Sequence, residues 1–245
     1  MLAELLAQSG HKILRNVAPD GREYWAARFW DRASAEEHPV LRKSFLDQKD
    51  AIAGYLSKYA AGITTSLEVA CGTGEFTKLT ADLTGVKEMT AIDISSQGLA
   101  RTQQRVDHDN LKLVHGDFWK ENGLPKADLV MCVDAIHHLG DIKEVLTRLR
   151  SFVKPGGLFI GNFWTADNFH EFERKRYGRA EHLRRTLAFF GTAALIRVSA
   201  GKLKTGAYRT QLRRSADSMT ALRTLYSEVL AVDEHRYFTS FAARL

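Results

Sequence analysis

A short stretch of the chain, SLEVACGTGEF from Ser66 to Phe76, combines an acidic side chain with a glycine-rich loop. Glu68 lies inside an apolar run, and Gly72 and Gly74 follow it closely. Glycines leave room for a backbone to approach a ligand, because they carry no side chain. The stretch therefore predicts a binding loop at the end of a strand, for a ligand of nucleotide type.

The residues after the second glycine argue against phosphate ligands. A P-loop ends in Gly-Lys-Ser/Thr, but Gly74 is followed by Glu75 and Phe76. A dinucleotide-binding fingerprint places a third glycine where this chain has Thr77, and the Glu75 carboxylate would repel a pyrophosphate. The P-loop interpretation fails, and the dinucleotide interpretation is weak.

Two more acidic residues follow apolar runs. Asp93 ends the run EMTAIDI, and Asp117 follows NLKLVH and Gly116. A carboxylate at a strand end can accept hydrogen bonds from ribose hydroxyls. Taken alone, Asp93 reads equally well as a helix cap beside Ser95, Asp117 as a turn former, and the adjacent Phe118 as a core residue.

Adjacent histidines, His137 and His138, follow the run ADLVMCV and Asp134. Histidine titrates near neutrality and can act as a general base for a hydroxyl group. Because adjacent side chains cannot both face the same way, at least one of the two is expected to be structural. The sequence does not rank them.

Strands and helices alternate from about residue 64 onward. Near-continuous apolar strands separated by helices predict a parallel sheet covered on both faces. Ser95 and Asp141 are expected to cap helices, and the Pro155-Gly156-Gly157 turn is expected to end one. The expected strands are 66–71, 88–94, 110–115, 127–133 and 158–164, and the expected helices are 75–83, from about 96 to 106 and from 142 to about 152.

With these motifs in order, the chain from about 64 to 164 resembles the class I S-adenosylmethionine (SAM)-dependent methyltransferases. The glycine loop resembles their first motif, with Ala70 in place of the commoner glycine. The resemblance implies an α/β fold with a doubly wound, seven-stranded, mostly parallel sheet, and it implies SAM as cofactor and no metal. It implies cofactor contacts at Glu68, Ala70, Cys71, Gly72, Gly74, Asp93, Ile94, Asp117, Phe118, Val133 and Asp134.

The placement of the histidines resembles small-molecule O-methyltransferases of the UbiE-like and natural-product groups. Some of these carry an aspartate on the fifth strand, where this chain has Asn162, which cannot act as a base but can orient a hydroxyl. The sequence lacks the Asn/Asp-Pro-Pro-aromatic motif of nucleic-acid amino-methyltransferases, and neither Cys71 nor Cys132 fits a cytosine C5 nucleophile. We therefore expect methyl transfer to a small molecule, at oxygen, with His137 or His138 as the base.

Two other functions remain open. A basic segment favours a methyltransferase acting on RNA or protein: residues 167–214 hold 12 Lys and Arg against 4 Asp and Glu, or +8 in a chain of net charge +6. This segment reads either as a solvated helical surface or as a lid that attracts an anionic substrate or surface. The other alternative is a non-methylating SAM-binding module or cyclase.

The composition, 44% apolar and 26% charged, is that of an ordinary globular protein. No apolar run is long enough for a membrane span, residues 1–14 lack signal-peptide features, and two core cysteines fit a reducing cytoplasm. Aromatic residues around Trp25 are expected to close the site. We expect an N-terminal helical cap (1–61), a SAM-binding core (62–166), a basic helical insertion that caps the substrate (167–218), and a last helix with the final strands (219–245).

Overall fold

The computed structural model describes residues 6, 25–26, 38–200 and 212–245. Most of the expected N-terminal cap, including the aromatic residues 24, 29 and 30, lies outside the described residues, and so do residues 201–211. The division into four parts stays a prediction.

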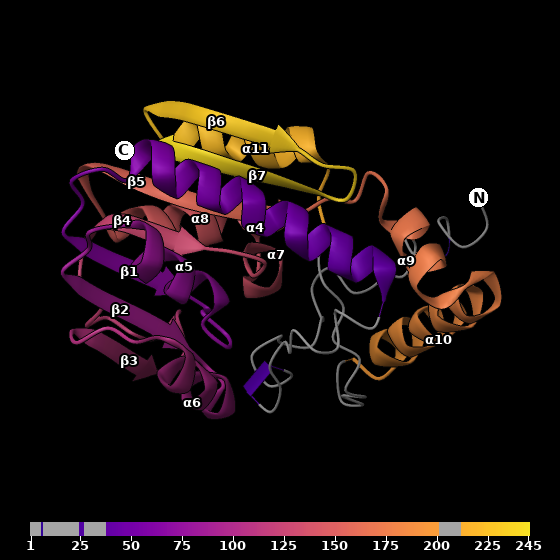
Figure 1. The fold of residues 1–245 in the computed structure, drawn as a ribbon. Helices are drawn as coiled ribbons and strands as arrows, with labels where there is room; N and C mark the ends of the chain where they lie inside the picture. Colours follow the sequence, from indigo (N-terminus) through magenta and orange to yellow (C-terminus); the bar gives the residue numbers. More distant parts are fainter. Residues whose placement is uncertain (1–5, 7–24, 27–37, 201–211) are drawn as a thin grey trace.

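One seven-stranded sheet forms the centre of the molecule, in the order β3-β2-β1-β4-β5-β7-β6 (Figure 1). The first five strands run parallel, and β7 pairs antiparallel with both β5 and β6. This confirms the doubly wound, mostly parallel sheet. The strands are β1 (Thr65–Val69), β2 (Glu88–Asp93), β3 (Leu111–His115), β4 (Ala127–Cys132), β5 (Val153–Trp164), β6 (Glu228–Glu234) and β7 (Phe238–Arg244).

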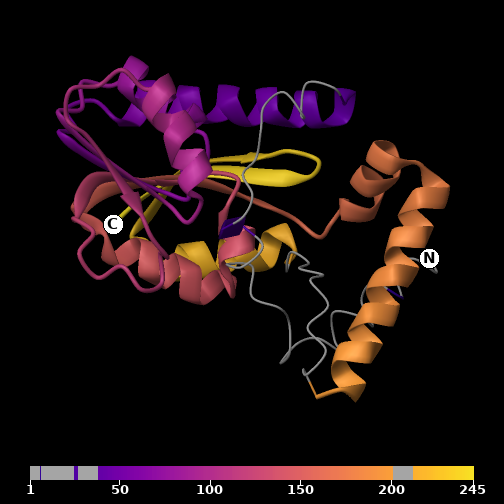
Figure 2. The ribbon, with the colours of Figure 1, turned by 90° about the horizontal axis from the view of Figure 1, so that it is seen from below.

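Helices cover both faces of the sheet (Figure 2). On one face, α4 (Pro39–Tyr59) and α5 (Glu75–Leu83) bury Ile52, Leu56 and Phe76 against β4 and β5. On the other, α7 (Ile136–Leu139), α8 (Ile142–Ser151) and α11 (Ser215–Leu225) bury a larger cluster that includes Leu146 and Leu222. α6 (Ser96–Arg105) packs beside β2 and β3. Burial on both faces explains why the strands read as continuous apolar runs.

Local signals set most helix ends. The Ser95 hydroxyl accepts a hydrogen bond from the Gly98 amide, and the Asp141 carboxylate accepts from the amides of Lys143 and Glu144, so both expected caps are present. α4 begins at Pro39, since proline suits the first turn of a helix. β5 begins at Val153, before the expected strand start at 158, since its glycines pair with the chain end at Leu245.

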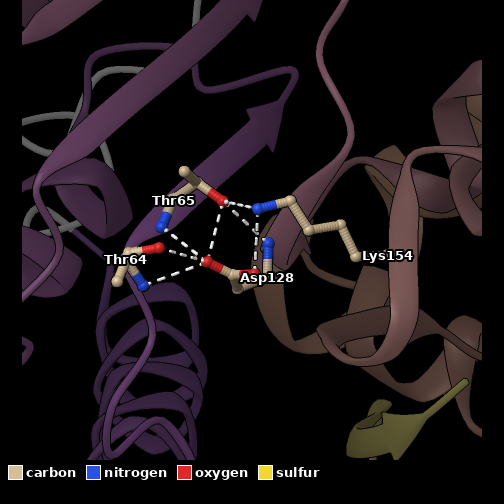
Figure 3. A network of polar contacts seen from close by, with 4 residues as sticks. All are labelled: Thr64, Thr65, Asp128 and Lys154. Atoms are coloured by element: carbon tan, nitrogen blue, oxygen red, sulfur yellow. Dashed lines mark hydrogen bonds and ion pairs between the residues drawn. The ribbon is translucent and has the colours of Figure 1, made fainter.

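A polar clamp ties the amino ends of β1 and β4 together (Figure 3). One Asp128 carboxylate oxygen accepts hydrogen bonds from the amides and hydroxyls of Thr64 and Thr65, at 2.7–3.0 Å. The other oxygen accepts from Lys154 Nζ at 3.0 Å. Burial would raise the pKa of Asp128, but the hydrogen bonds outweigh it and hold that pKa well below its ordinary range. The clamp lies at the amino ends of the strands, and the glycine loop lies at their carboxyl ends. The clamp therefore holds together β1 and β4, the two strands between which the strand order reverses.

Two helices, α9 (Phe169–Tyr177) and α10 (Arg179–Val198), form most of the described part of the basic insertion after β5. They pack on each other and extend away from the sheet (Figures 1 and 2). Within the described part of the chain, no helix combines the length and apolar composition needed to cross a bilayer.

Candidate active site

A pocket opens at the carboxyl ends of four neighbouring strands, β3, β2, β1 and β4. It holds about 1180 Å³ of empty space, part of it open to solvent. This edge lies where the strand order reverses direction, the usual ligand site of an open α/β sheet. The expected residues that line it are Glu68, Ala70, Cys71, Gly72, Asp93, Ile94, Asp117, Phe118, Val133, Asp134 and His138.

The two glycines of the loop have different neighbours. Both have a left-handed backbone, with φ of 56° at Gly72 and 75° at Gly74. A Cβ on Gly72 would meet nothing within 4 Å, whereas a Cβ on Gly74 would lie 2.7 Å from the Thr102 side chain. Gly72 therefore borders open pocket space, and Gly74 lets α5 and α6 pack closely without itself lining the pocket.

Ala70 also takes a left-handed conformation, with φ of 57°. An L-residue with a Cβ is strained there by about 1–2 kcal/mol relative to ordinary backbone. The strain explains why glycine is the commoner residue at this place in the motif. Ala70 is tolerated because the neighbouring strands β2 and β4 hold β1 on both sides.

The Asp93 carboxylate is held by the loop that it faces. One oxygen accepts a hydrogen bond from the Gly72 amide and the other from the Ser95 amide, both at 2.8 Å. Burial raises the pKa of Asp93, and the amide hydrogen bonds oppose that rise. Each oxygen keeps a lone pair for a further donor, so the arrangement fits a vicinal diol such as a ribose.

Glu68 is buried beneath the loop and accepts a hydrogen bond from the Thr77 hydroxyl at 2.6 Å. Burial raises its pKa to about 8, the Thr77 hydrogen bond opposes the rise, and the negative charge of Asp93 adds to it. A buried carboxyl of this kind ionises more readily when a cation lies beside it. The residues present therefore fit a cationic ligand such as SAM.

The third acidic residue, Asp117, organises the turn after β3. Its Oδ1 accepts a hydrogen bond from the Trp119 amide at 2.9 Å, and the Trp119 indole donates to the Leu139 carbonyl at 2.8 Å. The turn-forming role of Asp117 and its place in the pocket wall are thus both present. Phe118 is likewise both a core residue and a lining residue.

Asp134, at the end of β4, lies in a polar cluster within the pocket wall. It has a left-handed φ of 56°, its amide donates to Asn162 Oδ1 at 2.5 Å, and its carboxylate accepts from the Trp164 indole. Burial raises the pKa of Asp134 to about 6, and hydrogen bonds from Trp164 and Gln48 oppose the rise. Asn162 is fully buried and does not line the pocket, so it positions Asp134 instead of facing a ligand.

The structure separates the two histidines. His138 lines the pocket, and its ring lies 4.8 Å from the Trp25 ring. His137 is buried, does not line the pocket, and its ring lies 6.5 Å from that of Trp164. Burial lowers the pKa of His137 well below its usual value and that of His138 to about 3. Both rings are therefore neutral at physiological pH.

Several wall residues were not expected from the motifs. Phe45 and Phe76 follow helical spacing and read as core, yet they line the pocket from α4 and α5. Trp119 also lines the pocket. Its position directly after Asp117 and Phe118 is the one feature of the sequence that indicates a place in the site. Trp25, in contrast, was expected to close the site and does line the pocket. Among the described residues, no group of three or more His, Cys, Asp or Glu is placed to hold a metal ion.

Residues 67–159 match the family model described as a methyltransferase domain. Together with the sheet order and the glycine-loop pocket, this match identifies the core of the chain as a methyltransferase domain whose cofactor is SAM.

Several curated proteins are similar to parts of the chain. The demethylmenaquinone methyltransferase of Staphylococcus aureus is 27% identical over 156 residues, which are 61% of this chain and 58% of that protein. An uncharacterised protein of Synechococcus sp. is 34% identical over 120 residues, which are 47% of this chain and 26% of that protein. The chain thus matches less than two thirds of the length of either relative.

Solved structures share the fold over nearly the whole chain. The N-methyltransferase NodS from Bradyrhizobium japonicum, in complex with S-adenosylhomocysteine (SAH), has a TM-score of 0.56 at 16% identity, covering 98% of this chain and 97% of that one. The magnesium protoporphyrin IX methyltransferase ChlM from Synechocystis, with bound SAM, has a TM-score of 0.57 at 14% identity, covering 91% and 89%. At these identities the likeness shows the fold.

Proposed function

We propose that the chain transfers a methyl group from SAM to a small-molecule acceptor, at a hydroxyl oxygen. When bound, SAM supplies an electrophilic methyl group on a sulfonium centre. The observation that carries the proposal is the pocket itself, in which the acidic strand ends, the open side of Gly72 and His138 face one shared space.

The acidic residues provide the cofactor half of the site. Asp93 accepts hydrogen bonds from the ribose hydroxyls, since its carboxylate is already oriented by two amides. Glu68 balances positive charge near the amino acid end, and Asp117 accepts a hydrogen bond from the adenine amino group, beside the Phe118 ring. Gly72 leaves the space in which the backbone approaches the ligand.

The acceptor half is aromatic. Trp25, Phe45 and Phe76 supply ring surfaces, and His138 and Asp134 supply polar groups. An apolar wall with few polar groups suits a small ring-bearing molecule better than a charged polymer. The wall also supports the proposal that the N-terminal region caps the site, because Trp25 and Phe45 both belong to residues 1–61. No described residue of 167–218 lines the pocket.

We assign His138 the role of accepting the acceptor's hydroxyl proton. Burial lowers its pKa to about 3, so the ring is neutral at every pH above roughly 4, but it is also a weak base. It accepts the proton in the transition state, because the hydroxyl becomes strongly acidic as its oxygen bonds to the methyl carbon. Acidification from pH 8 to pH 6 leaves the charge of this group unchanged. The reaction also requires the acceptor to be aligned with the methyl group, and we assign this to the pocket wall formed by the end of β4 and by α7.

The test is transfer of labelled methyl from SAM to a panel of hydroxylated small molecules, with SAH release as a second readout. In His138→Ala, kcat is expected to fall by roughly 10²–10⁴-fold, with SAM affinity unchanged. His137→Ala is the matched control, and the folded protein should keep kcat near the parental value. If both variants match the parent, no base acts here, and a nitrogen or carbon acceptor becomes the better assignment.

The basic segment from 167 to 214 supports a second candidate, methyl transfer to RNA or protein. Labelled transfer into either polymer, with none into small molecules, would favour that function. Failure to release SAH with any acceptor would favour a non-methylating SAM-binding module or cyclase. We propose the cytoplasm as the compartment, since Cys71 and Cys132 are both buried, unpaired thiols.

A further inference from the structure

Exposed apolar side chains gather on one helix of the basic insertion. Among the described residues, six large apolar side chains are exposed, and four of them lie on α10. They are Leu183, Leu187, Leu195 and Val198, which are 39%, 50%, 54% and 87% exposed. Single exposed leucines are common on protein surfaces, but four on one helix form a contiguous feature that calls for a physical cause.

The four side chains form a single stripe. Successive members are four, eight and three residues apart, spacings that return to one side of an α-helix. Gly191, between Leu187 and Leu195, and Ala180, one turn before Leu183, lie on the same side and are also exposed. The opposite side of α10 is buried and includes Phe189, Ala193 and Ile196. The stripe therefore faces away from the protein.

Arginines border the stripe. At 3.6 residues per turn, Arg179 and Arg197 lie along one edge of the stripe, and both are exposed. Arg184 lies within the stripe, and both Arg184 and Arg185 pair with Glu181, the one acidic residue of the helix, which lies along the other edge. The helix thus combines exposed apolar side chains with four arginines against one glutamate, which is a net positive charge.

We propose that α10 docks this protein on the surface of an anionic lipid bilayer. The exposed surface of α10 presents leucines with arginines beside them, a combination that suits contact with a bilayer interface. Its apolar side chains enter the acyl region, and its guanidinium groups contact lipid phosphates. Figures 1 and 2 show α10 at the periphery of the molecule, where such a surface can reach it.

Two other occupants fit the stripe less well. A second copy packed stripe to stripe would bring the bordering arginines of both copies together, and like charges repel. A nucleic acid would meet leucine and valine at the centre of the contact, instead of the basic and aromatic side chains that bind phosphates and bases. An anionic bilayer is complementary to both parts of the surface.

The experiment is co-sedimentation of the full-length protein with vesicles of phosphatidylcholine alone, and with vesicles containing one quarter phosphatidylglycerol. We expect the parent to bind the anionic vesicles more than tenfold more tightly, and the binding to weaken as salt is raised. The double variant Leu187→Glu/Leu195→Glu should lose at least tenfold of that binding. The matched control is Leu46→Glu/Leu83→Glu, which changes two leucines that are each 43% exposed on α4 and α5.

Three results would overturn the proposal. The first is no binding of the parent to anionic vesicles at low salt, and the second is an α10 variant that binds as tightly as the parent. A dimer in sedimentation equilibrium that Leu187→Glu dissociates would assign the stripe to a second copy instead. Retained SAH binding in both double variants, measured by calorimetry, shows that the vesicle result does not come from unfolding.

Discussion

Gly72 and Gly74 are two residues apart and share a left-handed backbone, but only Gly72 faces open pocket space. Substitution by alanine strains both positions by about 1–2 kcal/mol. Gly72→Ala also places a methyl group where the ligand binds, and we expect SAM affinity to fall at least tenfold. Gly74→Ala forces a Cβ against Thr102, so its main effect should be a lower melting temperature.

Calorimetric titration and thermal unfolding of both variants separate these effects. Equal losses of SAM affinity in the two folded variants would contradict the assignment of Gly72 to the ligand and Gly74 to helix packing.

The raised pKa of Glu68 makes both the stability of the protein and its affinity for SAM depend on pH. This pKa is about 8 in the folded protein, against 4.5 for an unperturbed glutamate. The folded state therefore holds more protons between these values, and this contribution to stability is full below about pH 4.5 and lost as pH rises to 8. Asp93 is the charged neighbour that adds to the shift.

Glu68→Gln keeps the size of the side chain and an acceptor for Thr77 but removes the titration. Without ligand, we expect the variant to match the parent near pH 5 and to melt higher than the parent at pH 9. It should bind SAM more weakly at pH 9, because the carboxylate charge is gone. The test measures the melting temperatures of both proteins from pH 5 to pH 9, and their SAM affinities by calorimetric titration at pH 5 and pH 9. A parallel pH dependence in both proteins would show that Glu68 does not carry the shift.

At the scale of elements, the Asp128 clamp joins β1, β4 and the start of β5. Asp128→Asn removes the ion pair with Lys154, and we expect the melting temperature to fall by about 3–6 °C at pH 7. Because the folded pKa is depressed, the contribution is present above about pH 4 and is lost as pH falls below it. The two melting temperatures should therefore converge at low pH.

Asp82→Asn is the control for the clamp. It breaks an exposed ion pair between neighbouring turns of α5, which contributes little to stability. An equal fall in both variants would indicate a general charge effect rather than the clamp.

At the scale of the whole molecule, ligand binding is coupled to folding. A ligand that binds only the folded state stabilises it by about 2.7 kcal/mol at one hundred times its dissociation constant. For a chain of 245 residues, SAH at that concentration should raise the melting temperature by about 5–10 °C. Asp93→Ala should need a higher SAH concentration for the same rise, because hydrogen bonds worth on the order of 1–3 kcal/mol are lost.

Thermal shift assays over a series of SAH concentrations give both values. If SAH raises the melting temperature of Asp93→Ala at the same concentrations as that of the parent, Asp93 does not contact the ligand.

The sequence by itself determined the order of strands and helices, the caps at Ser95 and Asp141, and the acidic residues that end β2 and precede the glycine loop. These features depend on local periodicity and capping chemistry, which act between residues close in the chain. Parallel strands bring their carboxyl ends to one edge, so the location of the pocket also followed from the sequence.

Only the tertiary structure decided which residues face the pocket. His138 lines the pocket and His137 does not, and Phe45 of α4 forms part of the pocket wall. Open space lies beside Gly72 but not beside Gly74. The tertiary structure also leaves one side of α10 exposed while burying the other. Spacing in the sequence fixes which residues share a side of an element. The direction in which that side faces is set by packing against elements far along the chain.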